Sequence, residues 1–240
     1  MSISSDSLKA EESRIQAAYA RRRTGDLYSR FNPATLFMAQ ERERFVLRLL
    51  SRHGFSRLQN KRILEIGCGT GDILRDFIKW GARPENTTGI ELLPDRVSEA
   101  VHLCPKATRI DRGNAANLNF PTAHFDLVVQ STVFTSVLDL QTKKQMAFEM
   151  VRVLKPDGLI LWYDYHINNP RNRDVRAVKR QEIYHLFPDS HIQLRRITLA
   201  PPIARLIAPY SWLLCYFLSK VPWLCTHYVG VIRKQLPNRR

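Results

Sequence analysis

Short apolar runs alternate with amphipathic stretches through the middle of the chain, from residue 62 to residue 165. The apolar runs predict buried strands, and the stretches between them, which carry apolar residues at helical spacing, predict helices. The strands are expected at 62–67, 86–92, 108–115, 125–131 and 159–165, and the helices at 72–81, 94–104 and 140–154. Strands that alternate with helices require crossover connections, so the sheet should be mostly parallel.

The regions on either side of this core carry further elements. They are expected to be helices at 13–23 and 34–52 and strands at 193–199 and 227–234, with a loose start over residues 1–12 and a turn at Lys-Pro-Asp-Gly (155–158). The fold class is therefore α/β, a doubly wound and mostly parallel seven-stranded sheet with an N-terminal helical cap and a C-terminal helical insertion before the last strand. We divide the chain into a cap at 1–60 and a main domain at 61–240, with the insertion at 200–225.

The segment 200–225 is apolar enough to raise the question of a membrane span. It contains Arg205, Lys220 and four prolines, and a span between two strands would divide their sheet. We therefore expect this segment either to form a helical lid packed on the core or to lie as an interfacial helix on a membrane.

The chain is strongly basic, with 37 Lys and Arg against 22 Asp and Glu and a formal net charge of +15. The excess of positive charge lies in the flanks. Residues 61–160 hold 13 basic and 12 acidic side chains, whereas residues 161–240 hold 13 basic and 4 acidic side chains. Basic flanks suggest an anionic partner, such as nucleic acid, a phosphorylated substrate or an anionic membrane surface. Solubility alone is the other interpretation.

The cysteines Cys68, Cys104, Cys215 and Cys225 form no Cys-x-x-Cys pair and no cluster with histidine at metal-ligand spacing. We expect reduced, buried thiols in a cytosolic protein and no bound metal. The start of the chain has no apolar stretch typical of a signal peptide. The predicted location is cytoplasmic, at the inner face of the membrane if 200–225 is interfacial.

Three glycines at alternate positions, Gly67, Gly69 and Gly71, follow the first strand in ILEIGCGTG (63–71). A glycine turn between a strand and a helix N-terminus is typical of nucleotide binding. The pattern Glu-x-Gly-x-Gly-x-Gly departs by one residue from the Gly-x-Gly-x-x-Gly fingerprint of dinucleotide sites. Glu91 ends the second strand, where a carboxylate can accept hydrogen bonds from a ribose diol. The alternative is a glycine turn that only packs.

The segments LEIGCGTG, GIEL, GNAANLNFPTAHFDLVV and VLKPDGLILWYDY, in this order and spacing, closely resemble the class I S-adenosylmethionine-dependent methyltransferases over about residues 61–165. The resemblance implies a Rossmann-like fold, S-adenosylmethionine as cofactor, S-adenosylhomocysteine as product, and no metal. The cofactor-binding residues that it implies are Glu65, Gly67, Cys68, Gly69, Gly71, Glu91, Leu92, Asn114, Ala115, Gln130 and Ser131.

The same resemblance implies a role for each group. Glu65 and the glycine turn would hold the methionine moiety, Glu91 would bind the ribose hydroxyls, and Leu92 would pack on the adenine. Asn114, where the family often has Asp, and Ala115 would border the adenine. In a separate segment after the fourth strand, Gln130 and Ser131 would approach the methionine moiety and the transferred methyl group.

The candidate general bases are Asp164 and His166, which follow the fifth strand and share one face if the extended backbone persists. The alternative is that Asp164 is a loop or cap residue and His166 is solvated. More loosely, YSRFNP (28–33) and NNPRNRDVR (168–176) resemble bacterial methyltransferases of small-molecule and cell-envelope glycan pathways, which implies a cap over the site. The tentative acceptor contacts are Tyr28, Arg30, Phe31, Phe134 and Tyr165.

Three functions compete. The first is methyl transfer to oxygen or nitrogen of a small-molecule or lipid-linked saccharide acceptor, with an anionic group or aliphatic tail matching the basic C-terminal third. The second is RNA methylation, which rests on charge; QSTV stands where base methyltransferases often carry a motif like Asn-Pro-Pro-Tyr, so nucleic acid is not the expected partner. The third is a non-catalytic protein that binds S-adenosylmethionine.

Overall fold

The computed structural model describes residues 5–21, 29–170 and 172–235. The helices are α1 (Ser5–Ala20), α2 (Pro33–Arg52), α3 (Asp72–Lys79), α4 (Pro94–Leu103), α5 (Leu140–Val153), α6 (Arg180–Leu186), α7 (Pro201–Ile207) and α8 (Trp212–Leu218). The strands are β1 (Ile63–Ile66), β2 (Thr87–Glu91), β3 (Arg109–Arg112), β4 (Phe125–Ser131), β5 (Leu154–Tyr165), β6 (Ser190–Leu199) and β7 (Cys225–Lys234). Short 3-10 turns lie at η2 (Pro84–Asn86), η3 (Phe134–Ser136) and η4 (Pro222–Leu224).

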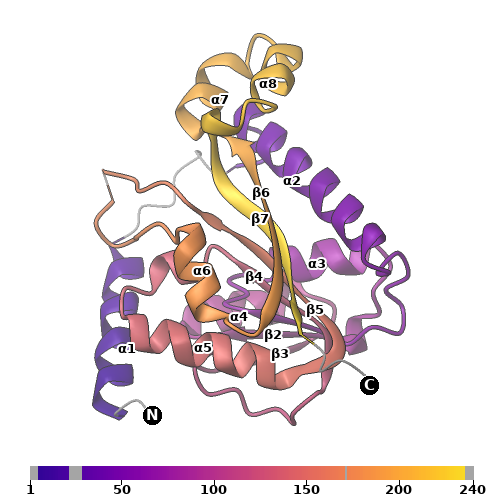
Figure 1. Cartoon of the computed structure of the whole chain (residues 1–240), viewed down its shortest axis with the longest axis vertical. Coiled ribbons are helices and arrows are strands. Elements are labelled where there is room, and N and C mark those ends of the chain that lie inside the picture. The colour runs from indigo at the N-terminus through magenta and orange to yellow at the C-terminus, as the bar shows by residue number, and fades with distance from the viewer. Residues whose placement is uncertain (1–4, 22–28, 171, 236–240) are drawn as a thin grey trace.

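The seven strands form one sheet in the order β3-β2-β1-β4-β5-β7-β6. Strand β7 runs antiparallel to both of its neighbours, and the other neighbouring pairs are parallel. The predicted α/β fold with a mostly parallel seven-stranded sheet is thus confirmed. Helices cover both faces of the sheet, with α2 and α3 on one face and α5 and α6 on the other (Figure 1).

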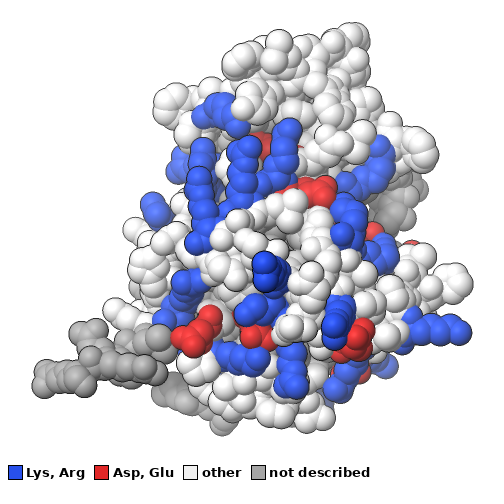
Figure 2. Space-filling model, turned by 90° about the vertical axis from the view of Figure 1, so that its right-hand side faces the viewer, with Lys and Arg blue, Asp and Glu red and all other residues white. Residues whose placement is uncertain are grey.

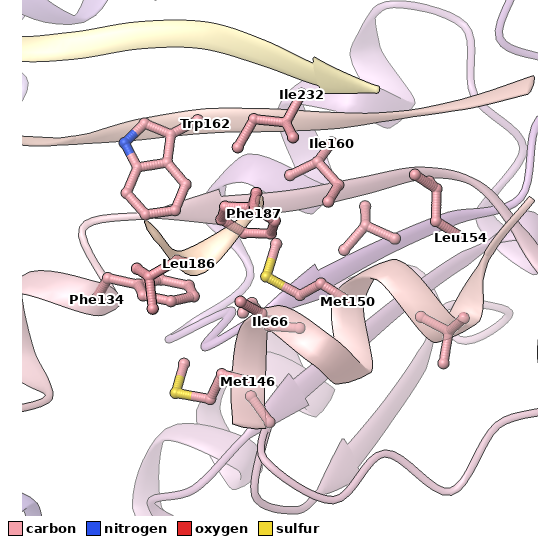
Figure 3. Packing of buried hydrophobic residues seen from close by; sticks show 14 of the residues in the cluster. Ile66, Phe134, Met146, Met150, Leu154, Ile160, Trp162, Leu186, Phe187 and Ile232 are labelled. Atoms are coloured by element: carbon pink, nitrogen blue, oxygen red, sulfur yellow. The ribbon is translucent and has the colours of Figure 1, made fainter. Parts of the chain in front are cut away.

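The larger core lies between the sheet and α5 and α6 (Figure 3). Trp162 of β5 is its centre, with its ring centroid 4.8 Å from that of Phe134 and 6.0 Å from that of Phe187. Met150 of α5 packs into the same cluster. Because these side chains are fully buried or nearly so, they fix α5, α6 and η3 against the end of the sheet that carries the candidate site.

Helix α1 begins well before the predicted position, so the loose start predicted for residues 1–12 is wrong from Ser5 onward. Tertiary contacts explain the difference. Leu8 packs against the larger core, and the buried carboxylate of Glu11 accepts hydrogen bonds from the Arg14 side chain and from the N–H of Leu138. Leu138 and the larger core lie far along the chain from α1, so local periodicity does not reveal these contacts.

The predicted turn at 155–158 is also wrong, because β5 begins at Leu154 and runs through it. Leu154 pairs with Phe125, and the register between β4 and β5 shifts before Leu127. This irregularity places the extra residues of β5 inside the strand, where a β-bulge accommodates them.

The segment 200–225 forms two seven-residue helices, α7 and α8, followed by η4, between β6 and β7. Within the described part of the chain, no helix has both the length and the apolar character needed to cross a bilayer. Ala204, Ala208 and Cys215 are buried against Ala34 and Phe37 of α2, so this segment is packed on the rest of the protein.

Helix α6, which the sequence pattern did not predict, is joined to α5 by an ion pair. Lys143 of α5 is completely buried, and its Nζ lies 2.6 Å from Oε1 of Glu182 of α6. Burial lowers the pKa of Lys143, and Glu182 opposes that shift. A buried ammonium that keeps its charge needs such a partner.

We expect Glu182→Ala to reduce the free energy of unfolding by about 3 kcal/mol, because it leaves the Lys143 ammonium buried without its carboxylate. Urea denaturation measures the loss. Adding Lys143→Met to the same variant should restore most of the stability, because it removes the unpaired charge and retains the packing volume. A loss well below about 1 kcal/mol in the single variant would show that the pair does not hold α6.

Candidate functional site

The candidate site lies where the sheet order reverses. The chain passes from β1 through α3 to β2 on one side, whereas β4 pairs with the opposite edge of β1. In open α/β sheets, ligands bind in the crevice outside the carboxyl ends of the strands at this switch point. The glycine turn, the end of β2 and the segment after β4 all meet there.

The three glycines of the turn adopt left-handed backbone angles, with φ of 60° at Gly67, 56° at Gly69 and 80° at Gly71. A Cβ atom at Gly67 would lie 2.7 Å from Cγ2 of Val133, so that glycine is required for packing. At Gly69 the only neighbour within 4 Å, among the residues that the structure describes, would be Nη1 of Arg96, at 3.4 Å. The turn is therefore closed at its base and open at Gly69, where a ligand can approach the main chain.

The rest of the turn is tied to its surroundings. Gly71 forms the N-cap of α3, and a Cβ there would collide with Sγ of Cys104 at the end of α4. The N–H of Cys68 donates to the carbonyl oxygen of Ile90 at 3.0 Å, and burial raises the pKa of its thiol. Cys68 thus fixes the turn to β2 as an inert, buried thiol.

Glu65 is a buried acid beneath the turn, and one of its two carboxyl oxygens is unpaired. Oε2 has no hydrogen-bond partner within the described chain, whereas the carboxyl accepts a hydrogen bond from the backbone of Leu74. Burial raises the pKa of Glu65 well above its usual range, while Arg42 opposes that shift. A buried carboxyl oxygen without a partner is costly, and a cationic ligand group at this position would relieve that cost.

Glu91, at the end of β2, holds two loops together. Its Oε2 accepts from the N–H of Gly69 at 2.8 Å, and its Oε1 accepts from those of Leu92 and Leu93 at 2.9 and 3.0 Å. The carboxylate is therefore at the edge of the glycine turn. The sequence suggested a ribose contact for Glu91 and did not reveal these backbone contacts.

Helix α1 lies over the segments that follow β3 and β4. Nδ2 of Asn114 donates to Glu12 at 2.5 Å, and Oδ1 of Asn114 accepts from the N–H of Ala116 at 2.8 Å. Tyr19 lies under the guanidinium of Arg96, with 4.5 Å from Cζ to the ring centroid. Asn114 therefore sits between α1 and a buried loop that includes Ala115, and α1 is part of this site.

The segment after β4 contains a strained residue that the sequence did not single out. Thr132, a β-branched residue, has a φ of 57°, and its N–H donates to the carbonyl oxygen of Tyr163 at 2.8 Å. Gln130 is completely buried and spans the same turn, accepting from the N–H of Val133 and donating to Tyr163. Ser131, between them, is partly exposed. Such strain is typical of a functional turn.

The two candidate bases differ in access. Asp164 is completely buried, and its carboxylate accepts from the N–H groups of Tyr165 at 2.8 Å and Thr135 at 3.2 Å. Burial raises the pKa of Asp164 to about 7. His166 is half-buried, with its ring stacked 4.4 Å from that of Tyr228, and burial lowers the pKa of its imidazole.

The tentative acceptor contacts are dispersed. Arg30 and Phe31 line a cleft of about 420 Å³ that also involves Trp212 of α8. Phe134 lies in the core, where it offers no surface to an acceptor, and the ring of Tyr165 packs on His227 with centroids 3.8 Å apart. Tyr28 lies outside the described residues.

Comparison with known proteins finds similarity over part of the chain. Residues 63–158 match the family described as methyltransferase domain. A 2-methyl-6-phytyl-1,4-hydroquinone methyltransferase of Synechocystis sp. is 31% identical over 45% of this chain and 33% of its own length. A fatty-acid O-methyltransferase of Mycolicibacterium smegmatis is 31% identical over 45% of this chain and 38% of its own length. The chain thus spans less than half the length of these two curated relatives.

A solved structure shares the fold. The crystal structure of a SAM-dependent methyltransferase from Methanosarcina mazei superimposes with a TM-score of 0.54 at 16% identity, covering 76% of this chain and 96% of that one.

We expect S-adenosylmethionine to bind more tightly as the pH rises. Because the pKa of Glu65 is raised, the ligand-free protein keeps this proton at a pH where a free carboxyl has lost it, and a cationic amino group needs the carboxylate. Binding should then release a proton, which calorimetry in buffers of different ionisation enthalpy detects.

Glu65→Gln should weaken binding by about tenfold or more and remove the pH dependence. Asp126→Asn is the matched control, because Asp126 accepts from the N–H of Arg62 at the opposite edge of the sheet. An unchanged affinity in Glu65→Gln would exclude Glu65 from the binding of the amino group.

Proposed function

We propose that this chain is a class I S-adenosylmethionine-dependent methyltransferase. It transfers the methyl group of S-adenosylmethionine to oxygen or nitrogen of a lipophilic small-molecule or lipid-linked acceptor. The observation that carries the acceptor class is the apolar surface at the carboxyl edge of the sheet, the edge that also carries the candidate cofactor site. Exposed aromatic and aliphatic side chains are concentrated there, on the segment between β6 and β7.

The residues of the switch point fit the cofactor. The unpaired Oε2 of Glu65 suits the amino group of the methionine moiety, and the open position at Gly69 leaves room beside the main chain. Glu91 would bind the ribose hydroxyls while keeping its backbone contacts, and Leu92, Asn114 and nearby residues would border the adenine. When bound, the cofactor supplies a sulfonium methyl group that is already activated.

The remaining task of the protein is to position the acceptor and to remove its proton. A base is needed where the acceptor is a hydroxyl or a protonated amine. His166 suits this role, because its lowered pKa keeps the imidazole neutral and its Nε2 has no hydrogen-bond partner within the described residues. Asp164 accepts from the backbone of η3 through Thr135, and so positions the segment after β4. Gln130 and Ser131, at the end of β4, would form the rest of this part of the site.

The names of the relatives support an apolar acceptor. One is named for a hydroquinone with a phytyl chain and another for a fatty acid. The cleft that Arg30 and Phe31 share with Trp212 combines a cation with aromatic surface, which suits an acceptor with a polar head and an aliphatic tail.

Labelled methyl transfer to a fractionated cell extract tests the acceptor class. With S-adenosylmethionine labelled in its methyl group, we expect most incorporated label to enter the organic-soluble pool. Heat-inactivated protein and the Glu65→Gln variant serve as controls. Label confined to RNA would favour the nucleic-acid alternative, and the absence of enzyme-dependent label in every pool would favour a non-catalytic binding protein.

His166→Asn should lower kcat about a hundredfold when the substrate is the extract fraction that accepts the label, and it should leave cofactor affinity unchanged. The reason is that the substitution removes the base and keeps a side chain of similar volume. The wild-type pH profile should lose its acidic limb in this variant. Asp164→Asn should have a smaller effect on kcat, because Asp164 acts through the backbone of η3 and an amide oxygen keeps one of its two backbone N–H contacts. The reverse order of the two losses would assign the base to Asp164.

A further inference from the structure

Large apolar side chains are exposed on one continuous part of the chain, the segment 201–224 between β6 and β7. We call it the apical hairpin. Tyr210 is 88% exposed and Trp223 is 77% exposed. The other exposed large apolar residues of the hairpin are Leu206, Trp212, Leu213, Leu214, Tyr216 and Phe217. A monomeric soluble domain rarely displays so many large apolar side chains together, so this surface indicates a partner.

The exposed surface belongs to a well-anchored element. The opposite side of the hairpin is buried against α2, and the ring of Trp212 meets that of Phe37 edge-on with centroids 5.9 Å apart. Ser211 caps α8 by accepting from the N–H of Leu214. The hairpin thus has one face packed on the protein and one face turned outward, as an element built for surface contact does.

Basic side chains predominate around the hairpin. The stretch 190–230 contains Arg195, Arg196, Arg205 and Lys220 and no aspartate or glutamate. Glu41 of α2, which interacts with Lys220, is buried. Nζ of Lys220 lies 4.2 Å from the ring centroid of Tyr216, and the guanidinium of Arg195 lies 5.0 Å from that of Phe45. Figure 2 shows an almost uncharged top, with a row of Lys and Arg side chains directly beneath it. We call this row of Lys and Arg side chains the basic band. An apolar tip above a basic band complements a surface that is apolar inside and anionic at its rim.

The hairpin occupies the ligand-binding edge of the sheet. Strand β6 leads into it at Leu199 and β7 leaves it at Cys225, which are paired with each other. Two residues further, His227 is opposite Tyr165 at the carboxyl end of β5. The cleft lined by Phe31 and Trp212 opens at the same end. Any surface that the hairpin contacts therefore faces the edge of the sheet that carries the candidate site.

We propose that the apical hairpin docks the protein onto the surface of an anionic lipid bilayer. Aromatic residues enter the headgroup region, Leu206 and Leu213 reach the acyl boundary, and the basic band meets anionic headgroups. The helices have seven residues each, so the hairpin lies in the interface and does not span it. A second copy of the chain is a poorer occupant, because a two-fold contact would bring the same basic bands together.

This inference rests on the proposed function in one respect, namely that the methyl acceptor is taken from the bilayer. The docking itself is tested without any methyl transfer. Co-sedimentation with vesicles of phosphatidylcholine and phosphatidylglycerol measures the partition coefficient of the full chain. We expect binding to the mixed vesicles that is at least tenfold stronger than binding to phosphatidylcholine alone and that falls with added salt.

Tyr210→Ser/Trp223→Ser should reduce partitioning at least tenfold, and both side chains are exposed enough for the variant to fold. Phe148→Ser is the matched control, because Phe148 is 60% exposed on α5, away from the hairpin, and should leave partitioning unchanged. For the charges, Arg195→Gln should weaken binding to the anionic vesicles, whereas Arg83→Gln, ahead of β2 at the amino edge, should not.

Wild-type protein that stays in the supernatant at low salt, or an equal loss in Phe148→Ser, would overturn the docking. So would a concentration-dependent dimer in light scattering that the hairpin variant abolishes, because the occupant would then be a second copy. If vesicle binding fails while label still enters the organic-soluble pool, the docking is wrong and the proposed function stands. If the protein binds vesicles but label enters only RNA, the docking stands and the proposed function is wrong.

Discussion

The carboxylate of Glu91 is the contact on which the candidate site depends. It joins the glycine turn after β1 to the loop after β2 by accepting three backbone N–H groups, from Gly69, Leu92 and Leu93. Buried N–H groups without an acceptor are costly, so the two loops hold their geometry because one side chain serves both. In the proposed ribose contact, the carboxylate is already positioned before the nucleoside binds, which reduces the ordering that binding requires.

The middle of the chain could be predicted from its sequence because its signals are local. Apolar strands, helix-spaced apolar faces and the glycine turn each occupy a few consecutive residues, and the switch point follows from their order. What failed depends on distant partners: α1 is held through Glu11 and Leu138, β5 extends because Leu154 pairs with Phe125, and α6 is held by its ion pair. The site shows the same division, since the left-handed Thr132 is visible only in three dimensions.

Two elements outside the sheet and the helices that cover its faces approach the carboxyl edge from different directions. Helix α1 reaches the segments after β3 and β4 through Asn114 and Ser136, whereas the apical hairpin extends from the ends of β6 and β7. The contacts of α1 at this edge are polar and charged, whereas the outward face of the hairpin is aromatic and aliphatic. The proposed nucleoside and the proposed apolar acceptor would therefore contact different elements at the same edge.

The direction of β7 has a consequence for how this chain can change over time. Parallel neighbours are joined by a crossover that must traverse a face of the sheet, but β6 and β7 are antiparallel neighbours joined directly at one edge. Residues can be added, removed or exchanged between Leu199 and Cys225 while the strands keep their register and the helical layers stay in place. The outward face of the hairpin can therefore change while the glycine turn and the loops at the switch point keep their geometry.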